Sequence, residues 1–150
     1  MEQFDGNMEQ RVWQRVRGGS AEQPERMDLR ALMLSAMENA AAYRQLSGML
    51  TGRLRERAKG LLEGEQANIA CLKGIHLLST GAAMKPKAMN MSSDSAGKLL
   101  EKCFHRSRRS MVEYTSRTVD GEFGAVFQKM ADREREHGAV IAELLGELGR

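Results

Sequence analysis

The stretch FGAVFQKMADREREHGAVIAELLGEL, residues 123–148, decides the fold class of this chain. Each residue of an α-helix is rotated by about 100° from the one before it, so residues three or four positions apart share a face. By this measure Phe127, Ile141 and His137 all lie within about 60° of Glu134. The stretch therefore predicts a long amphipathic helix whose apolar face carries a carboxylate and an imidazole.

Three further segments have the helical period, and the residues between them indicate how they connect. Thr51-Gly52 predicts a short turn, Gly81 ends a helix, and residues 81–93 contain Pro86 and no amphipathic period. A short turn makes neighbouring helices antiparallel, whereas a long link can carry the chain from one end of a bundle to the other. We therefore expect an all-α four-helix bundle with one long crossover between its second and third helices. The expected helices run from Asp28 to about Leu50, from about Arg53 to Leu78, from Ser93 or Asp94 to about Thr118, and from an Asp120 cap to about Leu148.

The composition fits one such domain. The chain has 150 residues, of which 41% are hydrophobic and 29% charged, as in an ordinary globular protein. Residues 1–27 form a polar leader with a short amphipathic patch around Trp13, and residues 28–150 form the bundle. We expect Trp13 either to pack on the bundle or to contact a partner.

Charge and hydropathy bear on the partners of the protein. The net charge is only +3, and acidic residues are interleaved with the basic ones, so the clusters at 53–59 and 106–109 are interpreted as solvated helix faces rather than a nucleic-acid site. No run approaches the ~20 apolar residues of a membrane span. Cys71 and Cys103 are expected to be reduced thiols. Together with the polar start of the chain, this predicts a cytoplasmic protein, and the 11 methionines could serve the interface of a homodimer.

Carboxylates on apolar faces are the feature that bears on function. Glu38, Glu65 and Glu134 each lie near the centre of an apolar stripe in a different expected helix. Buried carboxylates are costly and repel one another unless a partner or a cation compensates them. Glu134 and His137 form a Glu-x-x-His pair, which suits iron, manganese or zinc. The alternative is that arginines such as Arg44 or Arg108 hold the glutamates.

Three stretches resemble the ferritin-like superfamily, in particular the rubrerythrin-like helical domain. They are ENAAAYRQL at 38–46, LLEGEQAN at 61–68 and GAVFQKMADREREH at 124–137. The resemblance implies a ferritin-like bundle with a di-metal carboxylate site, holding iron or manganese, that handles iron or detoxifies oxygen or peroxide. The ligands that it implies are Glu38, Glu65, Glu134 and His137. The chain has no Cys-x-x-Cys pair, so a rubredoxin-type iron site is not expected.

Two positions depart from the family pattern. Asn68 lies where the family has the histidine of its second helix, and an amide oxygen is a poor substitute for imidazole on iron. Glu101 is the counterpart of a glutamate of the third helix, but it lies at the edge of that helix's apolar stripe, and His105 is a possible substitute. Asn68 and Glu101 are therefore added to the candidate ligands as doubtful members. If the site is degenerate, the bundle would serve as a non-catalytic structural or interaction module, and this alternative stays open.

Overall fold

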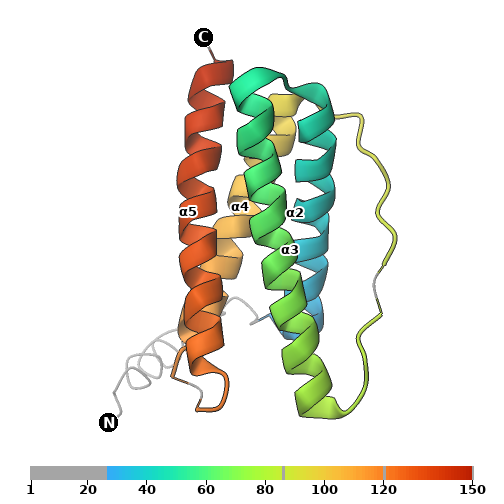
Figure 1. Cartoon of the computed structure of the whole chain (residues 1–150), viewed down its shortest axis with the longest axis vertical. Helices are drawn as coiled ribbons and strands as arrows, with labels where there is room; N and C mark the ends of the chain where they lie inside the picture. The colour runs from blue at the N-terminus through green and yellow to red at the C-terminus, as the bar shows by residue number, and fades with distance from the viewer. Residues whose placement is uncertain (1–26, 86, 120, 150) are drawn as a thin grey trace, which may run out of the picture.

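The computed structural model describes residues 27–85, 87–119 and 121–149, and Figure 1 shows these as four long helices with a long connecting segment. The helices are α2 (Leu29–Met49), α3 (Gly52–Thr80), α4 (Ala96–Ser116) and α5 (Gly124–Leu148). No strand occurs among the described residues. The predicted all-α four-helix bundle is confirmed. Of the leader predicted at 1–27, residues 1–26, including Trp13, lie outside the described residues, whereas Met27 is buried in the core of the bundle.

The helix ends follow the capping chemistry of the sequence. The Asp28 carboxylate accepts a hydrogen bond from the Ala31 N–H at 2.8 Å, as expected for the cap of the first helix. Gly81 ends α3 with a φ of 77°, a left-handed conformation that glycine adopts without strain. The third helix is capped by Ser95 rather than by Ser93 or Asp94. The fourth begins at Gly124, later than predicted, and Asp120 lies outside the described residues.

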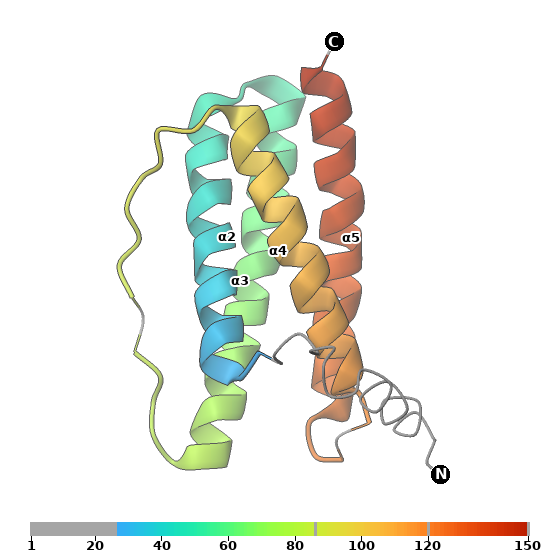
Figure 2. The same ribbon diagram turned by 180° about the vertical axis from the view of Figure 1, so that it is seen from behind.

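The helices form a four-sided bundle. The hairpin of α2 and α3 packs against the hairpin of α4 and α5, with α2 beside α4 and α3 beside α5. The segment between α3 and α4 runs along the outside from one end of the bundle to the other (Figures 1 and 2). The long crossover is therefore confirmed. In the basic cluster at 53–59, Arg53 and Arg57 form exposed ion pairs with Glu143, so part of its charge joins α3 to α5.

The core consists of two apolar clusters with a polar layer where they meet. One cluster includes Tyr43, Leu61 and Leu100, and the other includes Leu32, Leu72 and Tyr114. Along each helix, most of the buried polar side chains lie between the residues of the first cluster and those of the second. The others lie at the edge of the second cluster. The buried polar side chains are Ser35 and Asn39 on α2, Glu65 and Asn68 on α3, Ser107 and Ser110 on α4, and Glu134 and His137 on α5.

Candidate metal centre

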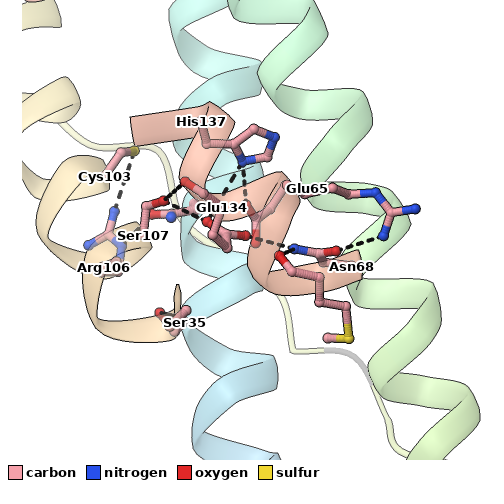
Figure 3. Close-up of polar contacts among 12 residues, drawn as sticks. Ser35, Glu65, Asn68, Cys103, Arg106, Ser107, Glu134 and His137 are labelled. Atoms are coloured by element: carbon pink, nitrogen blue, oxygen red, sulfur yellow. Dashed lines mark hydrogen bonds and ion pairs between the residues drawn. The ribbon is translucent and has the colours of Figure 1, made fainter. Parts of the chain in front are cut away.

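Three ionisable side chains meet in the polar layer, and they come from two helices. Glu65 lies on α3, and Glu134 and His137 lie one helical turn apart on α5 (Figure 3). Glu65 and Glu134 are each 1% exposed and His137 is 6% exposed. One ligand atom from each residue lies within 4.8 Å of the others, so the group could hold a metal ion. The prediction that these three residues converge is confirmed.

The spacing of the ligand atoms fits a single ion. His137 Nδ1 lies 3.3 Å from Glu65 Oε1 and 3.7 Å from Glu134 Oε1. Nitrogen and oxygen ligands bind at about 2.0–2.2 Å, so two ligands on one ion at right or tetrahedral angles are about 3.0–3.5 Å apart. Small side-chain movements would bring all three atoms into that range. Apart from their contacts within the cluster, Glu65 Oε1 and His137 Nδ1 have no hydrogen-bond partner among the described residues, so a ligand bond to either atom would displace no contact outside the cluster.

Glu134 is held by neutral hydrogen-bond donors from two other helices. The Ser107 hydroxyl on α4 donates to Glu134 Oε1 at 2.6 Å, and the Asn68 amide on α3 donates to Oε2 at 2.8 Å. Arg133 donates to the Asn68 amide oxygen at 3.0 Å, which orients the amide so that its NH₂ group faces Glu134. Asn68 therefore belongs to the site, but as a hydrogen-bond donor to a carboxylate, and its oxygen is engaged elsewhere.

The three groups shift one another's pKa values. Burial, followed by the charge of Glu134, raises the pKa of Glu65 from 4.5 to about 8. Burial alone would lower the pKa of His137, but its contacts with Glu134 and Glu65 outweigh burial and raise the pKa to about 9. Burial opposes ionisation of Glu134 as well, yet the contacts with His137 and Ser107 leave its pKa lowered. The pKa shifts of Glu65 and His137 thus favour their protonated forms, whereas that of Glu134 favours its carboxylate.

Gly64 allows His137 to occupy this position. A Cβ atom at residue 64 would lie 2.3 Å from His137 Nε2 and 2.9 Å from Cε1, far inside van der Waals contact. The imidazole therefore packs directly against the α3 backbone beside Glu65. Sequence reasoning misses both Gly64 and Ser107 as residues that serve the site. A glycine inside a helical pattern is the available signal for Gly64, and a serine within an apolar stripe is the signal for Ser107.

Two buried tyrosines flank the site. The Tyr43 ring on α2 meets the His137 ring edge to face with centroids 5.9 Å apart. The hydroxyls of Tyr43 and Tyr114 have no hydrogen-bond partner among the described residues. Burial, with the charges of Glu65 and Glu134 adding to it, raises the pKa of both phenols, so both stay neutral. The Tyr43 ring covers one side of the His137 imidazole.

The structure does not bring Glu38 or Glu101 to the site. Glu38 is half-buried on the outer side of α2, where it lines a surface cavity. Glu101 is exposed, and its nearest cation is Lys98 Nζ at 3.9 Å. The buried face of α2 follows its large apolar side chains, Leu32, Tyr43 and Leu46, whereas Leu34 and Met49, which favour the Glu38 face in the sequence, are 37% and 44% exposed. The assignment of Glu38 and Glu101 as ligands is corrected accordingly.

No arginine of the described residues forms a hydrogen bond or ion pair with Glu65 or Glu134. Arg44 is exposed, and Arg108 stacks over the Phe104 ring at 5.9 Å. The polar side chains that contact the two glutamates within the described part of the chain are those of His137, Ser107 and Asn68. The cluster is therefore compensated by an imidazole and by neutral donors rather than by a guanidinium.

His105 and the two cysteines lie outside the cluster as well. His105 is exposed beside the Phe104 ring, so it does not replace Glu101 as a ligand. Cys71 and Cys103 are free thiols, and burial raises the pKa of Cys103 to about 12. None of the described helices is long and apolar enough to cross a membrane.

Comparisons with known proteins add no relative. No family model, no curated protein and no solved structure matches the chain. The resemblance to rubrerythrin-like domains therefore stays a prediction from the three stretches of sequence that carry it.

Proposed function

We propose that this protein binds a transition-metal cation, iron or manganese, in the core of its bundle and uses it in redox chemistry or iron handling. The observation that supports the proposal is the convergence of Glu65, Glu134 and His137, all buried and within 4.8 Å of one another. Two carboxylates and one imidazole are a ligand set suited to these metals. The family resemblance points to the same chemistry and to reduction of oxygen or peroxide.

We favour one ion per chain over the two of a di-metal centre. A second ion would need further carboxylates, and Glu38 and Glu101 lie away from the cluster. Asn68 directs its NH₂ group rather than its oxygen at Glu134. Among the described residues, Glu65, Glu134 and His137 form the group that could bind a metal ion. Three protein ligands would leave coordination positions on that ion for water or an oxidant.

The residues of the chain have separable roles in this proposal. Glu65 and His137 would bind through Oε1 and Nδ1, the atoms that face each other in the cluster, and both would release a proton on binding. Ser107 and Asn68 orient Glu134, so its position does not depend on the ion. Iron or manganese, when bound, supplies a one-electron redox couple. The aromatic surroundings exclude bulk water from the site.

Metal analysis of the purified protein tests the proposal, with matched variants as controls. We expect about one ion per chain after loading with Fe²⁺ or Mn²⁺ under anaerobic conditions, and a rise in melting temperature. Glu65→Gln and Glu134→Gln should lose the ion. Glu63→Gln and Glu136→Gln, which change exposed carboxylates two residues away on the same helices, should retain it. Less than about half an ion per chain in the wild type would refute the proposal, and two ions would restore the di-metal interpretation.

A second candidate is a non-catalytic bundle in which the polar layer only specifies how the helices pack. The observation that favours it is that Ser107 and Asn68 already satisfy Glu134 and that a charged His137 balances it. In that case the variants above would change stability without any metal being bound. The homodimer and the cytoplasmic location stay predictions, and size-exclusion chromatography with light scattering tests the first.

A further inference from the structure

A long groove lies beneath the crossover, on the outer side of α2. It consists of two cavities of about 710 and 480 Å³ that share Met37 and Lys87 as lining residues. The crossover forms one wall, and Figures 1 and 2 show this segment running alongside α2 from end to end. Cavities of 300–1,000 Å³ are the usual size for small-molecule sites.

The crossover is anchored at both ends of the groove. At its start, His76 Nδ1 and the Ala82 carbonyl oxygen are 2.9 Å apart. Near its end, the Gln45 side chain donates to the Ser92 carbonyl at 2.7 Å and accepts from the Ser92 N–H at 3.0 Å. Lys102 then pairs with Asp94 at 2.8 Å. A segment with no helix of its own is thus held over α2 by side chains of the bundle.

The floor of the groove is apolar and adaptable. On α2 the larger cavity is lined by alanines, of which the half-buried Ala41 faces the space most openly while Ala40 and Ala42 are buried, and these small side chains leave the space open. Ile69 of α3 and Leu99 of α4 complete the floor on either side. Methionines of α2 and of the crossover supply flexible thioether walls that adjust to a ligand chain. They are Met33, Met37, Met84, Met89 and Met91.

The rim is strongly basic. Five lysines and arginines line the larger cavity, and Arg30 and Lys85 are added by the smaller one, against two carboxylates, Glu38 and Asp94. Asp94 is already paired with Lys102. Lys73 and Lys87 make no hydrogen bond or ion pair with any described residue, and they line the larger cavity from two elements, α3 and the crossover. The excess of positive charge here is larger than the +3 of the entire chain.

An apolar floor beneath a basic rim that includes the unpaired Lys73 and Lys87 is complementary to one class of ligand. We propose that this groove binds a single-chain amphiphile with an anionic head, such as a long-chain carboxylate. The alkyl chain would lie along the alanines and methionines, and the head would bind Lys73 and Lys87. This site uses none of Glu65, Glu134 or His137, so it is independent of the metal proposal.

Isothermal titration of the full chain with myristate, below its micelle concentration, tests the proposal. We expect saturable binding of about one myristate per chain. The double variant Lys73→Glu/Lys87→Glu should weaken binding at least about tenfold, because it reverses both unpaired charges. The control Lys59→Glu/Lys129→Glu makes the same change in net charge at exposed positions outside the groove and should bind as the wild type does.

A second variant tests whether the alkyl chain lies on the apolar floor of the groove. A neutral analogue of myristate and anionic vesicles test whether the anionic head group is recognised. Ala41→Trp should fill the larger cavity and abolish binding while leaving helix content and metal content unchanged. Three results would overturn the proposal. They are no saturable binding by the wild type, equal binding of myristyl alcohol, and binding to anionic phospholipid vesicles without binding of monomeric myristate.

Discussion

Gly64→Ala is the sharpest test of how the metal site is built. The added methyl group would lie 2.3 Å from His137 Nε2, whereas a carbon and a nitrogen in contact are about 3.5 Å apart. The imidazole must therefore move by about 1 Å. Because His137 Nδ1 lies 3.3 Å from Glu65 Oε1, such a movement separates the ligand atoms or forces Glu65 to follow.

The expected change in the free energy of unfolding follows from two opposing effects, helix propensity and overpacking. Replacing glycine by alanine inside a helix stabilises it by about 0.5–1 kcal/mol. Overpacking a filled core costs about 1–3 kcal/mol. Gly60 lies one turn earlier on α3 and has open space around its Cα, so Gly60→Ala gains the first term without the second. Subtracting the two variants removes the helix-propensity term and leaves the overpacking cost, a difference of about 1–3 kcal/mol in the free energy of unfolding.

Urea denaturation of the metal-free protein measures this difference, and titration with Mn²⁺ measures the effect on binding. We expect Gly60→Ala to be as stable as the wild type or more stable, with unchanged affinity. Gly64→Ala should be less stable than Gly60→Ala and bind at least about tenfold more weakly, because a ligand displaced by about 1 Å no longer fits the ion. If Gly64→Ala matches Gly60→Ala in both measurements, His137 does not depend on the space at residue 64 and the geometric argument fails.

Three further predictions concern the polar layer. The pKa values of Glu65 and His137 are both raised in the folded metal-free protein, so each group holds its proton to a higher pH than it does in the unfolded chain. The free energy of unfolding should therefore fall as the pH rises from 5 to 9. Urea melts across this range measure the slope, and a flat profile contradicts the pKa shifts. Ser107→Ala removes the 2.6 Å hydrogen bond to Glu134 and should cost about 2 kcal/mol, with a loss below about 0.5 kcal/mol in the same assay counting against it. Tyr43→Phe removes a buried hydroxyl that lacks a partner among the described residues. The free energy of unfolding in the same urea assay should stay unchanged or rise by about 1 kcal/mol, whereas a clear loss would reveal a hydrogen bond to that hydroxyl.

The contrast between α5 and α2 shows how far a helical period can locate a site. Along α5, large side chains such as Phe127 and Ile141 mark one face without ambiguity, and Glu134 and His137 lie on it as predicted. Along α2, the run Ala40–Ala42 presents small apolar groups around much of the helix. The apolar residues of α2 therefore do not define which face of the helix is buried. For this reason the sequence pattern wrongly predicts that Glu38 lies on the buried face.

The sequence by itself determined the helices and the order of short turn, long crossover and short turn, because these depend on the local period and on caps such as Asp28 and Gly81. It also placed Glu65, Glu134 and His137 on apolar faces, but the same period wrongly added Glu38 to them. Tertiary structure alone decided what surrounds that cluster. The rotation of each helix about its axis is set by packing against its neighbours, and that rotation took Glu38 and Glu101 away from the site and brought Ser107 to it. The same packing set the His137 ring against Gly64 and left a basic, methionine-lined groove under the crossover, since both depend on distances between segments that are remote in the chain.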